Sequence, residues 1–529
     1  MTTLLDVVLF LPIGLFLLVL LIPREMGETI RIFSTIVSII VFLVSLGLVA
    51  NFEFAQAGYQ FVTQFQWVEN PNIQYKIGLD GLSLWLVVLT TFVTPIAIMI
   101  SWKAIDFRLK EFHAYILLLE FCLIGIFVSI DLFQYYVFWE LALVPLYFMI
   151  GIWGHGRKIY AAVKFFLYTL TGSVMMLAAI LYLYSRAGSF DYEVLLAQIS
   201  SGALQFTTFE ETLLFWAFFM AFAVKTPLFP LHTWLPDAHV EAPTAGSVDL
   251  AALMLKVGTY SMIRFCLPLF PSASQEFAPW ILAISVVGII YGAFVSLAQP
   301  NMKKLVAYSS VSHMGLVVVG IFSLTQQGLD GAVYLMLAHG ISTGALFIFV
   351  GFLTDRKDSL EIKDYGGLVH SAPALSTVFM FFVLASVGLP LMANFVGEFL
   401  ALQGAIQANF VLGVLAATTL VLSACYMLWL YQRVFFGEEP PDLQKQVYDM
   451  RPREWAAMLP MVAVLLWLGT YSQSFMPPIS VANAGVLGHL NKRVEMQVQR
   501  KVPAAIAPAA IVPVNALPVN AAAEVPSAR

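Results

Sequence analysis

Long apolar stretches, separated by short polar connections, repeat along the chain from its start to about residue 475. A helix needs about 20 apolar residues to cross the hydrocarbon core of a bilayer. Stretches of about this length predict fourteen membrane-spanning helices. They are expected near residues 4–22, 30–50, 82–101, 113–130, 132–153, 161–185, 211–240, 246–268, 277–299, 302–323, 330–353, 373–407, 409–433 and 454–474.

Two of these segments are too long for one straight helix, and both contain helix-breaking residues. Residues 225–236 include three prolines, which remove backbone donors and clash with the preceding helical turn. Residues 388–398 read Gly-Leu-Pro-Leu-Met-Ala-Asn-Phe-Val-Gly-Glu. One charged residue accompanies each break, Lys225 in the first and Glu398 in the second. Two breaks of this kind, five spans apart, are typical of inverted repeats with ion-handling sites at the discontinuous helices.

The pattern therefore predicts an all-α, polytopic membrane protein with two inverted five-helix repeats and two broken helices. The division of the chain is expected as follows: helices 1–3 in residues 1–110, the first repeat (helices 4–8) in 111–270, the second, inverted repeat (helices 9–13) in 271–434, and the last spanning helix in 435–480. An Ala/Pro-rich, disordered tail is expected in residues 481–529.

Composition agrees with a membrane protein and excludes several other classes. Hydrophobic residues make up 60% and charged residues 11% of the chain, against roughly 45–50% and about 25% in soluble domains. The formal net charge of −5 gives no reason to expect nucleic-acid binding. Cys122, Cys266 and Cys425 lie far apart in apolar stretches, so neither a metal cluster nor a disulfide framework is expected.

Basic residues of the predicted connections gather on one side of the membrane. Alternate loops, counted from residues 23–31 onward, hold fifteen of them, and the opposite loops hold little beyond Lys76 and Arg186. By the positive-inside rule, the first set faces the cytoplasm and both termini lie outside. The fifteen residues are Arg24, Arg31, Lys103, Arg108, Lys110, Arg157, Lys158, Lys303, Lys304, Arg356, Lys357, Lys363, Lys445, Arg451 and Arg453.

Charged and titratable residues also lie inside the predicted spans. A charge at the bilayer centre costs about 2.5–3.5 kcal/mol on insertion scales, and such residues usually mark ion or proton pathways. A lysine whose carboxylate partner moves near and away binds and releases a proton, and histidine exchanges protons near neutral pH. The candidates for such a relay are Glu140, Lys225, Lys256, His313, His339 and Glu398, with His232 near the first break.

Each candidate also has a plainer interpretation. Glu140 and Lys225 can form a static ion pair that holds the fold, and the histidines can serve as structural hydrogen-bonding groups. Lys256 can extend its ammonium toward a membrane surface, although it stands far from either end of its span. Asp249 precedes Lys256 by two helical turns and lies on the same helix face. It can be a further relay group or simply a residue near the helix end.

Four stretches of the sequence resemble the antiporter-like membrane subunits of respiratory complex I. They are residues 77–85 (IGLDGLSLW), 136–145 (YVFWELALVP), 222–247 (FAVKTPLFPLHTWLPDAHVEAPTAGS) and 312–315 (SHMG). The resemblance covers about residues 1–475 and is strongest to the subunit M, or mitochondrial subunit 4, family. Glu398 supports that choice, because subunits L and N and the Mrp-type antiporters usually have lysine there.

This resemblance implies roles for individual residues. Glu140 matches the family's carboxylate on the fifth helix, and Lys225 matches its lysine partner on the broken seventh helix. Lys256 matches the central lysine, and Glu398 matches the terminal glutamate. His339 matches a polar position on the eleventh helix. The chain departs from the family pattern at Asp249, where an apolar residue is expected, and in its Pro-rich tail.

The resemblance further implies a proton-translocating subunit of bacterial NADH:quinone oxidoreductase in the cell inner membrane, with both termini on the periplasmic side. No cofactor or metal is expected in this chain; NADH, FMN, iron–sulfur clusters and quinone are expected in partner subunits. The expected partners are L-like and N-like antiporter subunits, small membrane subunits and the lipid bilayer. An Mrp-type sodium/proton antiporter subunit is the main alternative, and a membrane scaffold without pumping is another.

Overall fold

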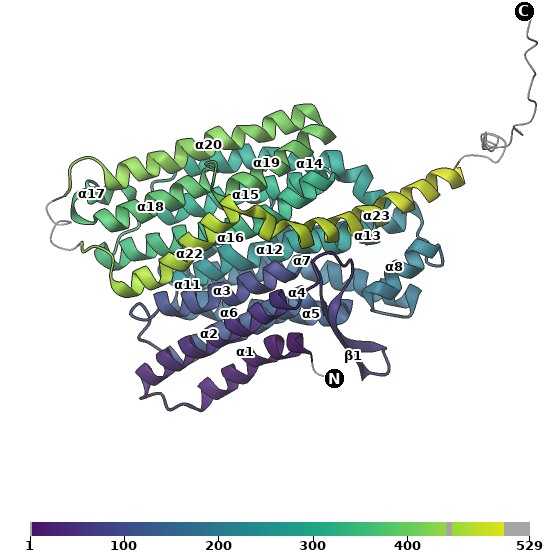
Figure 1. The fold of residues 1–529 in the computed structure, drawn as a ribbon, viewed down its shortest axis with the longest axis horizontal. Helices are drawn as coiled ribbons and strands as arrows, with labels where there is room; N and C mark the ends of the chain where they lie inside the picture. The colour runs from purple at the N-terminus through teal and green to yellow at the C-terminus, as the bar shows by residue number, and fades with distance from the viewer. Residues whose placement is uncertain (1–2, 441–446, 502–529) are drawn as a thin grey trace, which may run out of the picture.

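The computed structural model of the chain describes residues 3–440 and 447–501. These residues form a bundle of helices that run mostly along the long axis of the molecule (Figure 1). A β-hairpin and the helix α8 (Tyr192–Ser201) lie at one end of the bundle, and the short helix α17 (Leu368–Ser371) lies at the other (Figure 1). The predicted all-α membrane class is confirmed, with the hairpin as an addition to it.

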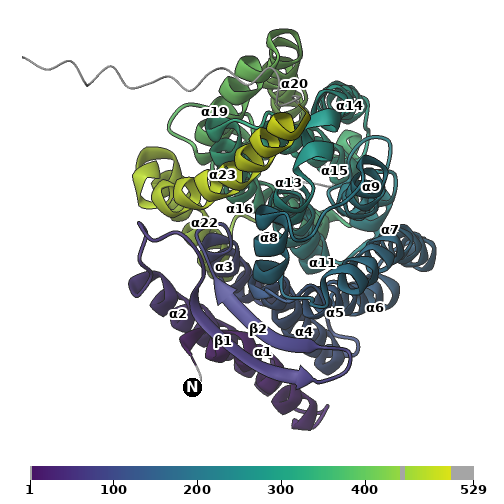
Figure 2. The same ribbon diagram turned by 90° about the vertical axis from the view of Figure 1, so that its right-hand side faces the viewer.

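The first part of the chain is α1 (Leu4–Leu21), α2 (Gly27–Ala50), the hairpin and α3 (Leu84–Ile100). The hairpin pairs β1 (Gln60–Val68) antiparallel with β2 (Ile73–Leu79), in a register that sets Phe65 opposite Tyr75. The β2 strand is almost wholly buried, because its backbone lies against the start of the next helices. Ile130 donates its N–H to the Lys76 carbonyl at 2.9 Å, which fixes the hairpin across the end of the bundle (Figure 2).

The middle of the chain divides into two halves with the same order of elements. The first half contains α4 (Leu109–Val128), α5 (Leu132–Leu141), α6 (Leu143–Trp153), α7 (Lys158–Ala187), α8, α9 (Thr208–Lys225), α10 (Trp234–Glu241), α11 (Thr244–Asp249), the π segment η1 (Leu250–Met254), α12 (Leu255–Ser261), the π segment η2 (Met262–Cys266) and α13 (Leu267–Leu269). The second contains α14 (Pro271–Leu297), α15 (Met302–Phe322), α16 (Gln326–Lys357), η3 (Ile362–Asp364), α17, α18 (Pro373–Ser386), α19 (Ala393–Ala408) and α20 (Phe410–Phe435).

The same short backbone bridge recurs in both halves. Asp131, which caps α5, pairs with Asp191 after α7, and Asn301, which caps α15, pairs with Glu361 after α16. The first bridge directly precedes α8, and the second lies just before α17, at the opposite end of the bundle (Figure 1). Equivalent bridges at opposite ends are what an inverted repeat produces, and they support the predicted repeats.

Both predicted breaks are present. The first helix ends at Lys225, and the chain becomes helical again at Trp234. The second break separates α18, which ends at Ser386, from α19, which begins at Ala393. Gly388 has a φ of +77°, a left-handed conformation that glycine adopts without strain. The chain can therefore turn sharply between the two half-helices.

Ten helices among the described residues are long and apolar enough to cross a membrane, and α3 and α18 are apolar but shorter. The total of fourteen spans therefore stays a prediction. The most apolar windows of α11–α13 and of α16 are 100% buried, whereas those of α2 and α20 are 33% buried. The charged and titratable residues predicted to form the relay lie mainly on the inner helices, away from lipid.

The end of the chain differs from the sequence-based expectation. Helix α22 (Pro452–Thr470) and the short turn η4 (Ser472–Ser474) are followed by a further helix, α23 (Met476–Lys501), where a disordered tail was expected from residue 481. Ile479, Val486 and Leu490 are buried on one face of α23, at helical spacing. This face packs across the bundle (Figure 2), and the apolar spacing explains the correction. The rest of the expected tail, residues 502–529, lies outside the described residues.

Candidate functional site

Lys256 lies at the centre of the site, in a helix that is not a regular α-helix. Its segment α12 is flanked by the π segments η1 and η2, and the side chain is 0% exposed. The ammonium Nζ donates to the carbonyl of Ala251 and lies 2.8 Å from Nδ1 of His339 on α16. Single π turns inside α-helices occur often at functional sites. A buried cation here has two polar partners from two different helices.

A row of titratable side chains continues from Lys256 into the second half. The rings of His339 and His313 lie with their centroids 5.6 Å apart. Nδ1 of His313 lies 3.5 Å from Oε1 of Glu398, and the hydroxyl of Tyr426 lies 3.4 Å from the other ring nitrogen. His313, His339 and Glu398 are each at most 1% exposed. Four predicted site residues thus form one row, which ends at the second break.

Glu398 is set directly against the backbone of that break. A Cβ atom placed on Gly388 would collide with the carboxylate of Glu398. The close approach of chain and carboxylate explains why a residue without a side chain stands at this turn. The end of the row and the turn between α18 and α19 are therefore in direct contact.

Glu140 and Lys225, the predicted partners of the first half, are not joined by an ion pair within 4.0 Å in the part of the chain that the structure describes. The Lys225 ammonium instead lies 3.9 Å from the centroid of the Trp139 ring and donates to the Trp139 carbonyl at 3.4 Å. Oε1 of Glu140 is buried and makes no hydrogen bond to any described residue. The lysine is therefore held one residue away from the carboxylate.

The junction between Lys225 and Lys256 is closely packed. A Cβ on Gly258 would lie 2.7 Å from the carbonyl oxygen of Phe222 and would also meet the Thr226 side chain. Glycine at this position lets α9 approach the helix that carries Lys256. No hydrogen bond between described residues joins the two lysines directly.

His232 lies apart from the row. Its ring is surrounded by the rings of Phe229, Tyr291 and Tyr308, at centroid distances of 5.7, 5.2 and 6.2 Å. Neither ring nitrogen has a hydrogen-bond partner among the residues that the structure describes. The structure therefore brings six of the seven predicted residues to two places, the row from Lys256 to Glu398 and the Glu140–Lys225 pair, and leaves the seventh in an aromatic pocket.

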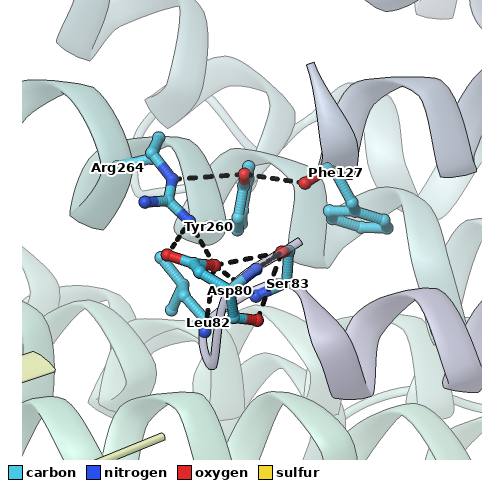
Figure 3. Close-up of polar contacts among 6 residues, drawn as sticks. All are labelled: Asp80, Leu82, Ser83, Phe127, Tyr260 and Arg264. Atoms are coloured by element: carbon cyan, nitrogen blue, oxygen red, sulfur yellow. Dashed lines mark hydrogen bonds and ion pairs between the residues drawn. The ribbon is translucent and has the colours of Figure 1, made fainter. Parts of the chain in front are cut away.

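Sequence reasoning missed a buried ion pair that anchors the central helix (Figure 3). Arg264 of η2 donates to both oxygens of Asp80, at 2.6 and 2.7 Å, and to the hydroxyl of Tyr260 at 3.2 Å. Asp80 also accepts the backbone N–H groups of Leu82 and Ser83. The pair ties the helix of Lys256 to the loop before α3. An arginine eight residues beyond Lys256, within the same apolar span, was the available signal.

A second ionic cluster lies outside the spans, at the hairpin end. Nζ of Lys76 lies 2.6 Å from Oδ2 of Asp191 and 2.6 Å from Oε2 of Glu193. Burial on its own lowers the pKa of Lys76, but the hydrogen bonds to the two carboxylates outweigh burial, and the pKa is raised. Burial raises the pKa of Asp131 to about 6, although three backbone N–H groups stabilise its carboxylate.

Polar cavities occur at the end of the bundle where the predicted basic loops meet. One cavity of about 320 Å³ is lined by His155, Lys303, Asp355 and Asp358, among others. Lys303 donates from Nζ to the Ala242 carbonyl at 2.6 Å, between α10 and α11. Among the described residues, no group of three His, Cys, Asp or Glu side chains is placed to hold a metal ion.

The amino-acid sequence of this chain is similar to those of several known proteins. A family model described as the transmembrane region of NADH:quinone oxidoreductase and Mrp antiporters matches residues 129–423. NADH-quinone oxidoreductase subunit M of Rhodobacter capsulatus is 46% identical over 482 residues, which cover 89% of this chain and 94% of that protein. NADH-ubiquinone oxidoreductase chain 4 of Marchantia polymorpha is 43% identical, with 91% of this chain and 96% of that protein covered.

A solved structure of respiratory complex I from Thermus thermophilus with bound NADH contains a similar chain. The TM-score is 0.83 and the sequence identity 34%, with 92% of this chain and 100% of that chain covered. The similarity therefore extends over most of this chain and the whole of the other.

Proposed function

This chain belongs to the subunit M family of NADH-quinone oxidoreductase (complex I), and we propose that it translocates protons through the buried row Lys256, His339, His313 and Glu398. The chain is a proton-translocating membrane subunit of that oxidoreductase. The proposal concerns which residues carry the proton and how they are used.

The observation that carries the proposal is the continuity of the row. Each of its four side chains exists with or without a proton, and each is buried and lies next to the following one. The two closest steps are 2.8 and 3.5 Å, and between them the two histidine rings lie in tilted contact, with their centroids 5.6 Å apart. A proton on Lys256 can therefore pass by His339 and His313 to the Glu398 carboxylate.

Glu140 and Lys225 act in this proposal as a charge switch beside the row. The ammonium of Lys225 has two available partners, the Trp139 ring that it contacts and the Glu140 carboxylate one residue away. Movement toward Glu140 stabilises the protonated lysine, and movement toward Trp139 weakens that stabilisation. The tight junction at Gly258 links this movement to the helix of Lys256.

His232 is proposed to serve the first break and not the row. Its aromatic surroundings and unpartnered nitrogens support a role at the broken helix, beside the segment where α9 ends. The 320 Å³ cavity at Lys303 supports entry of protons from the face that carries the basic loops. We propose that this face is cytoplasmic and that both termini lie on the periplasmic side of a bacterial inner membrane.

Redox chemistry is proposed to lie in partner subunits, which would hold NADH, FMN, iron–sulfur clusters and quinone. L-like and N-like antiporter subunits and small membrane subunits are the proposed neighbours. Sodium/proton exchange of the Mrp type is the second candidate, since the matching family model includes Mrp antiporters. The two named relatives, at 46% and 43% identity, favour the oxidoreductase.

The test uses the assembled complex in sealed vesicles. Lys256→Ala and Glu398→Ala are expected to lower NADH-driven proton uptake strongly, while Lys445→Ala, in a predicted basic loop, serves as a matched control. Normal uptake in both variants would rule out the row. Sodium/proton exchange by vesicles without NADH distinguishes the second candidate, and its absence would eliminate the antiporter function.

A further inference from the structure

Three buried titratable side chains lie outside the row, and none of them has its hydrogen-bonding capacity used. His113, Glu120 and Asp249 are 0%, 1% and 3% exposed. Both ring nitrogens of His113, both carboxylate oxygens of Glu120 and Oδ2 of Asp249 have no partner among the described residues. Buried polar groups nearly always have partners, or ordered water in place of them. Three such groups together need an explanation.

The three side chains form a second line of groups through the bundle. His113 and Glu120 lie on α4, seven residues apart and hence on one face, at a separation of about 10 Å along the axis. Asp249 is the last residue of α11, and its carboxyl is close enough to that of Glu120 to interact with it electrostatically. The helix of Lys256 contacts α4 directly. The line therefore crosses from α4 to the central helix.

One end of this line reaches a polar cavity. A cavity of about 430 Å³ is lined by Arg31 and by the first turn of α4, Leu109, Lys110 and Glu111. His113 follows that turn directly, and Arg31 is near enough to interact electrostatically with its ring. This cavity is separate from the one at Lys303, with no lining residue in common.

The other end reaches Lys256. The Lys256 ammonium does not extend away from Asp249 but back along its own helix, where it donates to the carbonyl of Ala251. That carbonyl is two residues from Asp249. Helical side chains lean toward the N-terminus in this way, so the lysine side chain extends over the π segment η1 in the direction of Asp249.

The chemistry of the two carboxyl groups, Glu120 and Asp249, follows from their surroundings. Two carboxyl groups that interact in apolar surroundings disfavour the state in which both are ionised, so such a pair is suited to hold a proton. Thr94 lies beside Glu120, and its hydroxyl donates to the Thr90 carbonyl at 3.0 Å. The pair is left as a proton-holding station between the cavity and Lys256.

We propose that His113, Glu120 and Asp249 form a second proton path, which leads from the cavity at the start of α4 to Lys256. This inference rests on the proposed function, because the path delivers its proton to the row described above. Water between the unpartnered groups completes the two longer steps, from His113 to Glu120 and from Asp249 to Lys256.

The test exchanges each carboxyl for its amide in the assembled complex. Glu120→Gln and Asp249→Asn keep the shape and a hydrogen-bonding group but cannot carry a proton. Each is expected to lower NADH-driven proton uptake in sealed vesicles and to remove a protonated-carboxyl band from the infrared spectrum. Glu120→Asp and Asp249→Glu, which restore a titratable group, are expected to recover part of the uptake.

Asp330→Asn is the matched control for loss of a buried carboxyl. Asp330 already accepts hydrogen bonds from Gln326 at 2.9 Å and from Asn483 at 2.8 Å, and it lies outside both lines of residues. Unchanged proton uptake in both Glu120→Gln and Asp249→Asn would overturn the second path and leave the row intact. Normal uptake in Lys256→Ala would overturn the row itself, so the two failures are distinct.

Discussion

Lys225 illustrates how a single residue can have two competing partners. Its ammonium lies over the Trp139 ring, while the Glu140 carboxylate stands beside that ring on the same helix. A cation–π contact in a desolvated site contributes about 2 kcal/mol, and an adjacent buried carboxylate competes with it. A switch requires two such competing arrangements of the same group.

Removal of the ring should bias this switch. In Trp139→Leu, we expect Lys225 to favour Glu140 and the proton to leave more slowly, with NADH-driven uptake reduced by up to about 30-fold for a loss of 2 kcal/mol. Proton uptake by vesicles measures the effect. Trp153→Leu, which removes a tryptophan that bonds the Phe107 carbonyl elsewhere, is the control. Equal rates in both variants would contradict the switch.

The ionic cluster at the hairpin end gives a prediction about stability. Lys76→Ala leaves the buried Asp191 carboxylate without its cation, at a cost of about 3–5 kcal/mol in the free energy of unfolding. Arg186→Ala, which removes a more exposed ion pair with Glu210, should cost much less, because water screens that pair. Thermal unfolding of the purified protein measures both. Similar losses in the two variants would argue against the cluster.

Asp131 gives a prediction about pH. Its pKa is raised by burial from 3.8 to about 6, so its contribution to stability is present below pH 3.8 and is lost as the pH rises through 6. Asp131→Asn cannot titrate and should escape this loss. The difference in unfolding free energy should shift in favour of the variant by up to about 3 kcal/mol between those pH values. A pH series of thermal unfolding measures the shift, and a constant difference would refute it.

Among residues, the sequence was informative where a charge interrupts an apolar run. Lys225, Lys256 and Glu398 were predicted for that reason, and the structure brings the last two into one row through His339 and His313. Trp139 gave no signal, because an aromatic residue in an apolar span is ordinary. Its role follows only from the position of the lysine above its ring, which depends on how α5 and α9 pack.

At the scale of elements, the break between α18 and α19 depends on Gly388. Gly388→Ala introduces a Cβ at a φ of +77° and against the Glu398 carboxylate. We expect a loss of about 1–3 kcal/mol of stability and reduced proton uptake, because the carboxylate must move. Gly14→Ala in α1, where a Cβ has open space, should instead stabilise by about 0.5–1 kcal/mol. Thermal unfolding and vesicle uptake test both.

The elements also differ in how predictable they were. Both breaks were predictable, the first from its three prolines and the second from Gly388 and the proline that follows it, because such residues interrupt a continuous helix. The π segments left no such mark, since they arise from packing around Lys256 and Arg264 and not from local propensity. The hairpin was missed although residues 64–67 alternate between glutamine and aromatic residues, the period of a strand.

At the scale of the whole molecule, α23 joins the two halves of the bundle. It contacts α8 and α13 of the first half and α14 and α16 of the second (Figure 2). Asn483 is 0% exposed and donates to Asp330 on α16 at 2.8 Å. Disorder was predicted from residue 481 because the end of the chain is rich in Ala and Pro, and the spacing of the apolar residues in α23 accounts for its buried face.

The junction at α23 can be weakened selectively. Asn483→Ala removes a buried hydrogen bond, and we expect a loss of about 1–3 kcal/mol in the unfolding free energy. Asn491→Ala, at an exposed position of the same helix, should change it by less than about 0.5 kcal/mol. Thermal unfolding of the full chain in detergent measures the two. A larger effect at Asn491 than at Asn483 would contradict the assigned packing.

The two π segments around Lys256 make the length of this helix as important as its composition. Each π segment accommodates one extra residue within its wide turn, so a deletion there is absorbed locally. Deletion of one residue from α12 beyond Lys256 removes no such extra residue, and everything after it would rotate by about 100° and retract by about 1.5 Å. The guanidinium of Arg264 would then leave Asp80, although that side chain had not been altered, while Lys256 would keep its place beside His339. Single-residue deletions should therefore be tolerated less well in residues 257–261 than in either π segment.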